Sequence, residues 1–188
     1  MTAGDERTAV TRPRIARALP GDEDRAAANA RMTALLTRPD PGPVAAHLAL
    51  LHFTGRRSGR GYTVPAGVHR IGDALYIASG SAWRHNFSGG ADGELTWRGK
   101  RTAARFELVT DPEPTARGYL ELYERYGAEA ARRRLGITVD DSRSAPTLED
   151  FRAAVTGIPL ALVTVTLADD TGDTGGTGEL AKNERTAR

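Results

Sequence analysis

The sequence contains no cysteine, and this absence excludes several kinds of chemistry. Without cysteine there is no disulfide framework, no thiolate metal ligand and no catalytic thiol. The histidines do not compensate, because their positions show no recognised metal-ligand spacing and no carboxylates accompany them at ligand periodicity. They are His47, His52, His69 and His85. We therefore predict no metal site.

Long apolar runs are also missing. No segment approaches the roughly 18 consecutive apolar residues that a membrane-spanning helix needs, and the first twenty residues lack a run of signal-peptide length. We expect a soluble, cytoplasmic protein. The 188 residues suit one domain, which we place at 21–167. The polar ends predict a disordered basic arm at 1–20, with at most weak membrane-surface association, and a disordered tail at 168–188.

The familiar nucleotide-binding and hydrolytic motifs are absent too. The glycine-rich loop at 55–60, GRRSGR, lacks the lysine followed by serine or threonine of a Walker motif, and a predicted strand follows it. No glycine-rich turn opens onto a helix, as a dinucleotide-binding α/β fold requires. Ser58 and Ser88 have no recognisable base or oxyanion hole, so hydrolysis is disfavoured.

Positive charge, in contrast, is concentrated in the middle of the chain. Residues 54–105 hold nine basic and three acidic residues, although the net charge of the whole chain is only +2. The loop at 55–60 contributes Arg56, Arg57 and Arg60, and its glycines let the backbone approach a ligand closely. This asymmetry predicts an anionic ligand, either a phosphorylated small molecule or a nucleic-acid backbone. An exposed basic turn without a ligand is the competing interpretation.

The hydrophobic pattern predicts an α+β fold that is mainly β. An alanine-rich helix begins at Asp22 and ends before Pro39. Closely spaced strands follow, with turns at 72–73 and 98–100 that indicate two hairpins. They lie at 49–53, 62–68, 74–78, 94–97 and 102–109. Without intervening helices, such strands favour an antiparallel sheet or a small barrel.

The last third of the domain is predicted to be largely helical. A helix over 116–135 ends at Gly136, a loop follows at 137–145, and a short helix covers 147–155. An apolar strand at 159–167 closes the domain. Tyr123 and Tyr126 share one face of the long helix, where core packing is a more common role than catalysis.

A second loop, SGSAWRHNF at 79–87, carries side chains suited to a planar ligand. Trp83 can stack on a ring, Asn86 can form hydrogen bonds with it, and Arg84 adds positive charge. A loop closed by one packed tryptophan is the alternative interpretation.

These segments together resemble the deazaflavin-dependent nitroreductase family. The resemblance rests on TGRRSGRGYTVP, a hairpin, SGSAWRHNF, the hairpin RGKRTAARFELV and the final strand GIPLALVTV. It covers residues 50–109 closely, together with the last strand, and the motifs are specific in combination. The family consists of split β-barrel oxidoreductases that use coenzyme F-420.

The resemblance implies a split β-barrel, like that of FMN-binding proteins, with flanking helices. It further implies an oxidoreductase that transfers a hydride from reduced coenzyme F-420 to a small nitro, enone or imine acceptor, and a homodimer as the assembly. For a reaction of this kind the candidate proton donors are Tyr126, Tyr123 and an ordered water. Arg56, Arg57, Ser58 and Arg60 would hold the anionic tail of the coenzyme, and Ser79 with the loop from Trp83 to Asn86 would lie near its ring. The cofactor-binding residues expected from the resemblance are Arg56, Arg57, Ser58, Gly59, Arg60, Thr63, Pro65, Ser79, Trp83, Arg84 and Asn86.

The sequence also departs from the family pattern. Arg57 replaces the more common lysine, and Gly61-Tyr62 stands where the family often has a small residue followed by arginine. An FMN-dependent split-barrel oxidoreductase is therefore the nearest alternative, and a non-catalytic coenzyme- or lipid-binding protein is another. Nucleic-acid binding is disfavoured, because no aromatic stacking platforms are interleaved with the arginines.

Overall fold

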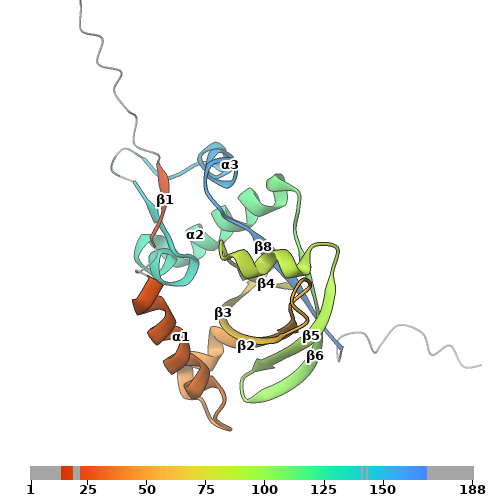
Figure 1. Ribbon diagram of the computed structural model, residues 1–188. Coiled ribbons are helices and arrows are strands. Elements are labelled where there is room, and N and C mark those ends of the chain that lie inside the picture. Colours follow the sequence, from red (N-terminus) through yellow and green to blue (C-terminus); the bar gives the residue numbers. More distant parts are fainter. Residues whose placement is uncertain (1–13, 19–21, 141, 143, 169–188) are drawn as a thin grey trace, which may run out of the picture.

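The computed structural model describes residues 14–18, 22–140, 142 and 144–168. Six strands form a closed barrel in the order β2-β3-β4-β8-β6-β5, with β5 pairing back onto β2 (Figure 1). They are β2 (Leu48–Thr54), β3 (Gly61–Ile71), β4 (Ala74–Ala78), β5 (Ala91–Trp97), β6 (Lys100–Leu108) and β8 (Leu162–Leu167). Every pairing is antiparallel. The expected α+β split-barrel class with flanking helices is confirmed.

Alternation along the strands fills the barrel. On β2, Ala49, Leu51 and Phe53 point into the interior, whereas Leu50 points outward. This period of two is the pattern that a strand with one face in the core must show. Phe87 and Phe106 complete the interior at one end of the barrel, and both are fully buried.

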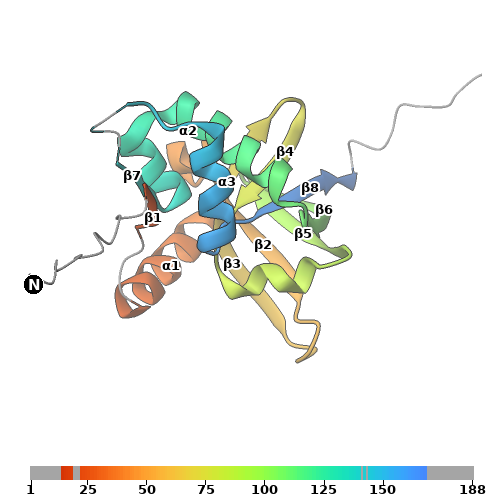
Figure 2. The ribbon, with the colours of Figure 1, turned by 90° about the horizontal axis from the view of Figure 1, so that it is seen from above.

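Three helices flank the barrel, as Figures 1 and 2 show. They are α1 (Asp22–Leu36), α2 (Pro112–Leu135) and α3 (Leu148–Gly157). A second core joins α2 and α3 to the outer face of β4 and β8, and Tyr119 and Leu122 lie fully buried within it. A smaller third core holds Leu36 of α1 against Leu50. Two short 3-10 helices, η1 (Gly42–Ala46) and η2 (Ala82–Phe87), connect the elements.

Helix ends follow from local sequence. Asp111 caps α2 by accepting a hydrogen bond from the backbone N–H of Glu113, and Gly136 ends the helix in the left-handed conformation. Thr147 and Asp150 form a reciprocal capping box at the start of α3. Gly127, at φ 73° and ψ 171°, interrupts α2 directly after Tyr126.

Three segments differ from the sequence-based expectation. Residues 15–17, within the predicted arm, form β1 (Ile15–Arg17), which pairs with β7 (Ile137–Val139) in the predicted loop. Ile15 is buried in the second core, so packing of this residue holds the short strand in place, and the local sequence pattern does not predict that packing. The segment predicted as a loop at 79–87 contains η2. Most of the predicted arm and the tail from residue 169 lie outside the described residues.

Candidate ligand-binding site

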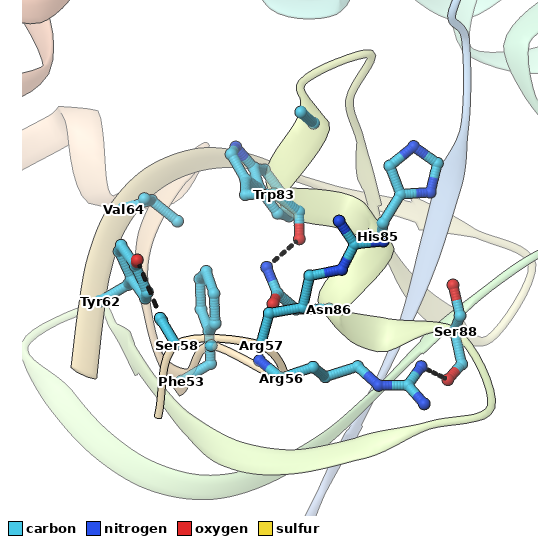
Figure 3. Close-up of a pocket in the computed structure, with 12 residues that line it drawn as sticks. Phe53, Arg56, Arg57, Ser58, Tyr62, Val64, Trp83, His85, Asn86 and Ser88 are labelled. Atoms are coloured by element: carbon cyan, nitrogen blue, oxygen red, sulfur yellow. Dashed lines mark hydrogen bonds between the residues drawn. The ribbon is translucent and has the colours of Figure 1, made fainter. Parts of the chain in front are cut away.

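A cavity of about 930 Å³ opens at one end of the barrel, between the β2–β3 loop and η2 (Figure 3). Its volume lies within the range of about 300–1,000 Å³ that small-molecule and cofactor sites occupy. The lining comes from Phe53, Gly55, Arg56, Arg57, Ser58, Tyr62, Val64, Ala82, Trp83, His85, Asn86 and Ser88. Two segments 30 residues apart thus face each other across one space.

One half of the cavity is apolar and aromatic. Phe53 and Tyr62, which are cross-strand partners, stack with ring centroids 5.6 Å apart and planes inclined by 22°. Trp83 lies 6.3 Å from Phe53, and Phe87 packs edge-on beneath both rings. Val64 extends this wall. A planar, apolar ring is the ligand part that such a surface accommodates.

The other half is polar and cationic. The backbone N–H of Arg56 donates to Oδ1 of Asn86 over 3.0 Å, and its guanidinium donates to the carbonyl of Ser88. Arg57 is exposed, and its guanidinium forms no hydrogen bond or ion pair with any described residue. Figure 3 shows it extending toward the η2 side of the cavity. No aspartate or glutamate occurs in the lining, so this half suits an anion.

The loop between β2 and β3 is fixed by its own backbone. The N–H of Gly55 donates to the carbonyl of Arg60, and the N–H of Gly59 donates to the carbonyl of Gly55, both over 2.8 Å. Gly59 adopts φ 65°, which a residue with a side chain rarely tolerates. The two arginines are therefore presented by a folded turn.

The cavity brings together five of the residues predicted from the sequence and leaves the others outside its lining. Those that line it are Arg56, Arg57, Ser58, Trp83 and Asn86. Gly59 and Arg60 belong to the same loop without lining the cavity, and Pro65 lies further along β3. Arg84 turns away and donates to the carbonyls of Gly80 and Ser81. The Ser79 hydroxyl accepts a hydrogen bond from the N–H of Ser81.

Thr63 belongs to a second, neighbouring cavity of about 580 Å³ on the outer face of the barrel. There its hydroxyl lies 3.0 Å from Nδ1 of His52, whose Nε2 lies 2.8 Å from the Thr96 hydroxyl. Burial, followed by the charge of Arg101, lowers the pKa of His52. Phe53 and Tyr62 border both cavities.

The two tyrosines suggested as proton donors lie away from the cavity. Tyr123 is buried beside Phe151, with ring centroids 6.0 Å apart. The Tyr126 hydroxyl lies 3.0 Å from Nδ1 of His69, and the Arg134 guanidinium covers its ring. Both belong to the second core, so a role for them in proton transfer remains a prediction from the resemblance.

Sequence reasoning missed part of the aromatic wall and part of the polar rim. Phe53 and Val64 could have been found from alternation, because each occupies an inward position near the open end of its strand. His85 stands within the predicted loop, one residue from Asn86, and it is exposed at the cavity. Tyr62 is the notable omission, although its place where the resembled family often has arginine was a signal.

No family model matches the chain, and no curated protein matches it. Solved structures similar to it include a pyridoxamine 5'-phosphate oxidase-related, FMN-binding protein from Nostoc punctiforme. That likeness has a TM-score of 0.44 at 14% identity and covers 79% of this chain and 83% of the other. An FAD- and haem-binding protein from Mycobacterium smegmatis has a TM-score of 0.38 at 18% identity, covering 84% of this chain and 70% of that one.

The described part of the chain shows neither a metal-binding cluster nor a membrane-spanning helix. No three His, Asp or Glu side chains gather there in a way that could hold a metal ion. No helix within the described ranges combines the length and apolar character needed to cross a bilayer.

Proposed function

We propose that this chain is an oxidoreductase that binds a flavin-type cofactor, either FMN or the deazaflavin coenzyme F-420, in the cavity at the end of the barrel. One observation carries the proposal: a single cavity joins an aromatic wall to a cationic rim without any acid in its lining. A planar tricyclic ring with an anionic tail has the same two parts in the same order. When bound, such a ring supplies hydride transfer.

The protein's own contribution is to bind and orient the ring. Phe53, Tyr62 and Trp83 offer the apolar surface, and they exclude water from the side of the ring that they cover. Arg56 is held in place by Ser88 and Asn86, so little conformational entropy remains to be lost when it binds an anion. Arg57 has no such anchor among the described residues, so its side chain can close on the anion.

Protonation of a reduced acceptor needs a group inside the cavity. His85 lines the cavity and can carry a proton at its imidazole, whereas Tyr123 and Tyr126 would have to act from the second core. The proposal therefore assigns this step to His85. Retention of full turnover by His85→Gln, with its cofactor affinity unchanged, would exclude the assignment.

FMN and coenzyme F-420 make different demands on the arginines. The single phosphate of FMN can be satisfied within the cavity by Arg56 and Arg57. The longer tail of coenzyme F-420, with a phosphodiester and several carboxylates, must continue outside it. Arg60 favours coenzyme F-420 as the cofactor, because it is exposed beyond the lining and its side chain forms no ion pair with any described residue.

A fluorescence titration of the full chain with FMN, FAD and coenzyme F-420 tests the proposal. Arg57→Ala should weaken cofactor binding by about tenfold, as expected when one charge-assisted hydrogen bond is lost. Arg133→Ala is the matched control, because Arg133 is an exposed arginine on α2 paired with Glu129. If none of the three cofactors binds saturably, the proposed function is wrong.

Two further results divide the alternatives. If the deazaflavin is the cofactor, Arg60→Ala should weaken the binding of coenzyme F-420 and leave the binding of FMN unchanged. Reoxidation of the bound, reduced cofactor by nitro, enone or imine acceptors then distinguishes an enzyme from a non-catalytic binding protein, which would bind without turnover.

A further inference from the structure

Tyr62 occupies an unusual position for a large apolar side chain. It is 41% exposed, and no other large hydrophobic side chain in the described part of the chain is exposed to that degree. One face of its ring stacks on Phe53 at the mouth of the barrel, and the ring borders both cavities. Its exposed area therefore lies where a ligand in the first cavity would contact it.

The hydroxyl of Tyr62 reaches back to the arginine-bearing loop. It lies 3.2 Å from the Ser58 hydroxyl, and that oxygen also accepts a hydrogen bond from the backbone N–H of Arg60. Figure 3 marks the contact between the two hydroxyl groups. The aromatic wall and the cationic loop are thus joined through one pair of hydroxyl groups. Ser58 is the loop residue that makes this connection.

Gly55 makes this arrangement possible. A Cβ atom at position 55 would lie 2.6 Å from the Ser58 hydroxyl and 2.7 Å from Cε2 of Tyr62, closer than real Cβ contacts allow. The space above Gly55 is therefore filled by the two side chains that form the connection. Any side chain at this position would force Ser58 or Tyr62 to move.

We infer that Tyr62 is the specificity-determining residue of the site, with its ring binding the planar part of the ligand and its hydroxyl positioning the anion-binding loop through Ser58. The inference rests on the proposed function, since it assigns the two halves of the ligand to two parts of one side chain. It also assigns the functional role to a tyrosine at the start of β3 in place of Tyr123 or Tyr126 on α2.

The two roles separate in a binding experiment with riboflavin and FMN, which differ only by the phosphate. Tyr62→Phe keeps the ring and removes the hydroxyl, so FMN should bind about 2- to 10-fold more weakly while riboflavin affinity stays unchanged. Tyr62→Ala removes the ring and the hydroxyl, so the binding of riboflavin should also weaken, by about fivefold or more. If coenzyme F-420 proves to be the cofactor, it and its ring–ribityl fragment replace the two probes.

Two companion variants exclude an unspecific structural effect. Tyr76→Phe removes a hydroxyl from β4 outside the cavity and should change neither affinity. Ser58→Ala should weaken FMN as Tyr62→Phe does, and the double variant should bind FMN no more weakly than either single variant, because both remove the same connection. Thermal unfolding of each variant confirms that it remains folded.

The outcomes are distinct for the inference and for the proposed function. If the unaltered chain binds FMN but Tyr62→Ala retains full affinity for riboflavin, the ring assignment is overturned. If Tyr62→Phe weakens riboflavin and FMN equally, or if its effect adds to that of Ser58→Ala, the positioning role is overturned. If the unaltered chain binds neither the flavins nor the deazaflavin, the proposed function fails and the inference fails with it.

Discussion

The buried histidine behind the barrel predicts a specific loss of stability in acid. His69 is 3% exposed, its Nδ1 lies 3.0 Å from the Tyr126 hydroxyl, and its Nε2 has no hydrogen-bond partner in the structure. Burial, followed by the positive charges of Arg134, Arg125 and His47, lowers the pKa of His69 to about 4. A neutral imidazole is thus part of the folded state.

The sign of the pH dependence follows from the two pKa values. The unfolded chain titrates His69 near the ordinary value of 6.5, so between pH 6.5 and 4 it binds a proton that the folded chain does not bind. Folded stability is therefore lost as the pH falls through this window. Linkage gives a loss of about 2 kcal/mol from this one group between pH 7 and pH 5.

Urea unfolding of the full chain at pH 7, 6 and 5 measures this effect, with His69→Gln as the non-titrating variant. The variant has lower stability at pH 7 because its contact with Tyr126 changes, but the difference from the unaltered chain should shrink by about 2 kcal/mol at pH 5. His52→Gln controls for the other histidine whose pKa is lowered. A difference between the unaltered chain and His69→Gln that stays constant with pH would refute the reasoning.

Three further changes should act on stability, each measured by urea unfolding. Gly93→Ala should lower the free energy of unfolding by about 2 kcal/mol or more, because the new Cβ would lie 2.4 Å from the His52 carbonyl on the paired strand. Gly157→Ala, where a Cβ would meet open space, should be nearly neutral, and equal effects of the two substitutions would contradict the clash. Phe87→Ala should cost about 3–5 kcal/mol and reduce ligand binding, because Phe87 is fully buried beneath the aromatic wall; a loss below 1 kcal/mol would contradict its place in the core. Thr147→Ala should cost about 1 kcal/mol through loss of the α3 capping box, and an unchanged unfolding midpoint would contradict that role.

The barrel strands were predictable because their residues obey a local rule. Alternation of inward and outward side chains on β2, and glycines in the turns at Gly72 and Gly99, encode the hairpins within a few residues of one another. The same holds for the end of α2 at Gly136 and for the start of α3 at its capping box, whereas α2 begins at Pro112, four residues before the expected start. Hairpins and helix caps depend on residues close together in the sequence, so they could be predicted from it.

The direction of individual side chains was less predictable. Trp83 and Arg84 are adjacent, yet Trp83 lines the cavity and Arg84 turns toward the carbonyl of Gly80, because η2 rotates successive residues around its axis. Read as an extended loop, the segment placed both near the ligand. Thr63 and Val64 also face opposite sides of the barrel wall, but there the cause is the alternation of side chains along β3.

Long-range packing was the part that the sequence concealed. Neither β1 nor β7 is long enough to show alternation, and each becomes a strand only because the other is beside it. Tyr123 and Tyr126 have the spacing of a helix face, and the competing functional role came from the resemblance alone. Their burial followed from α3 and β3 packing against that face.

The small sheet has a consequence for the order of folding. It joins residues 15–17 to residues 137–139, so its contacts close a loop that contains almost the entire barrel, and such contacts form only after the intervening chain has become compact. With three residues in each strand, it is also a low-energy point of local opening. Arg17 lies across Gly80 and donates to the Pro159 carbonyl, so detachment of β1 would uncover the segment that leads into η2. We therefore expect the N-terminal strand to dock late in folding, after the barrel that its partner strand follows has formed.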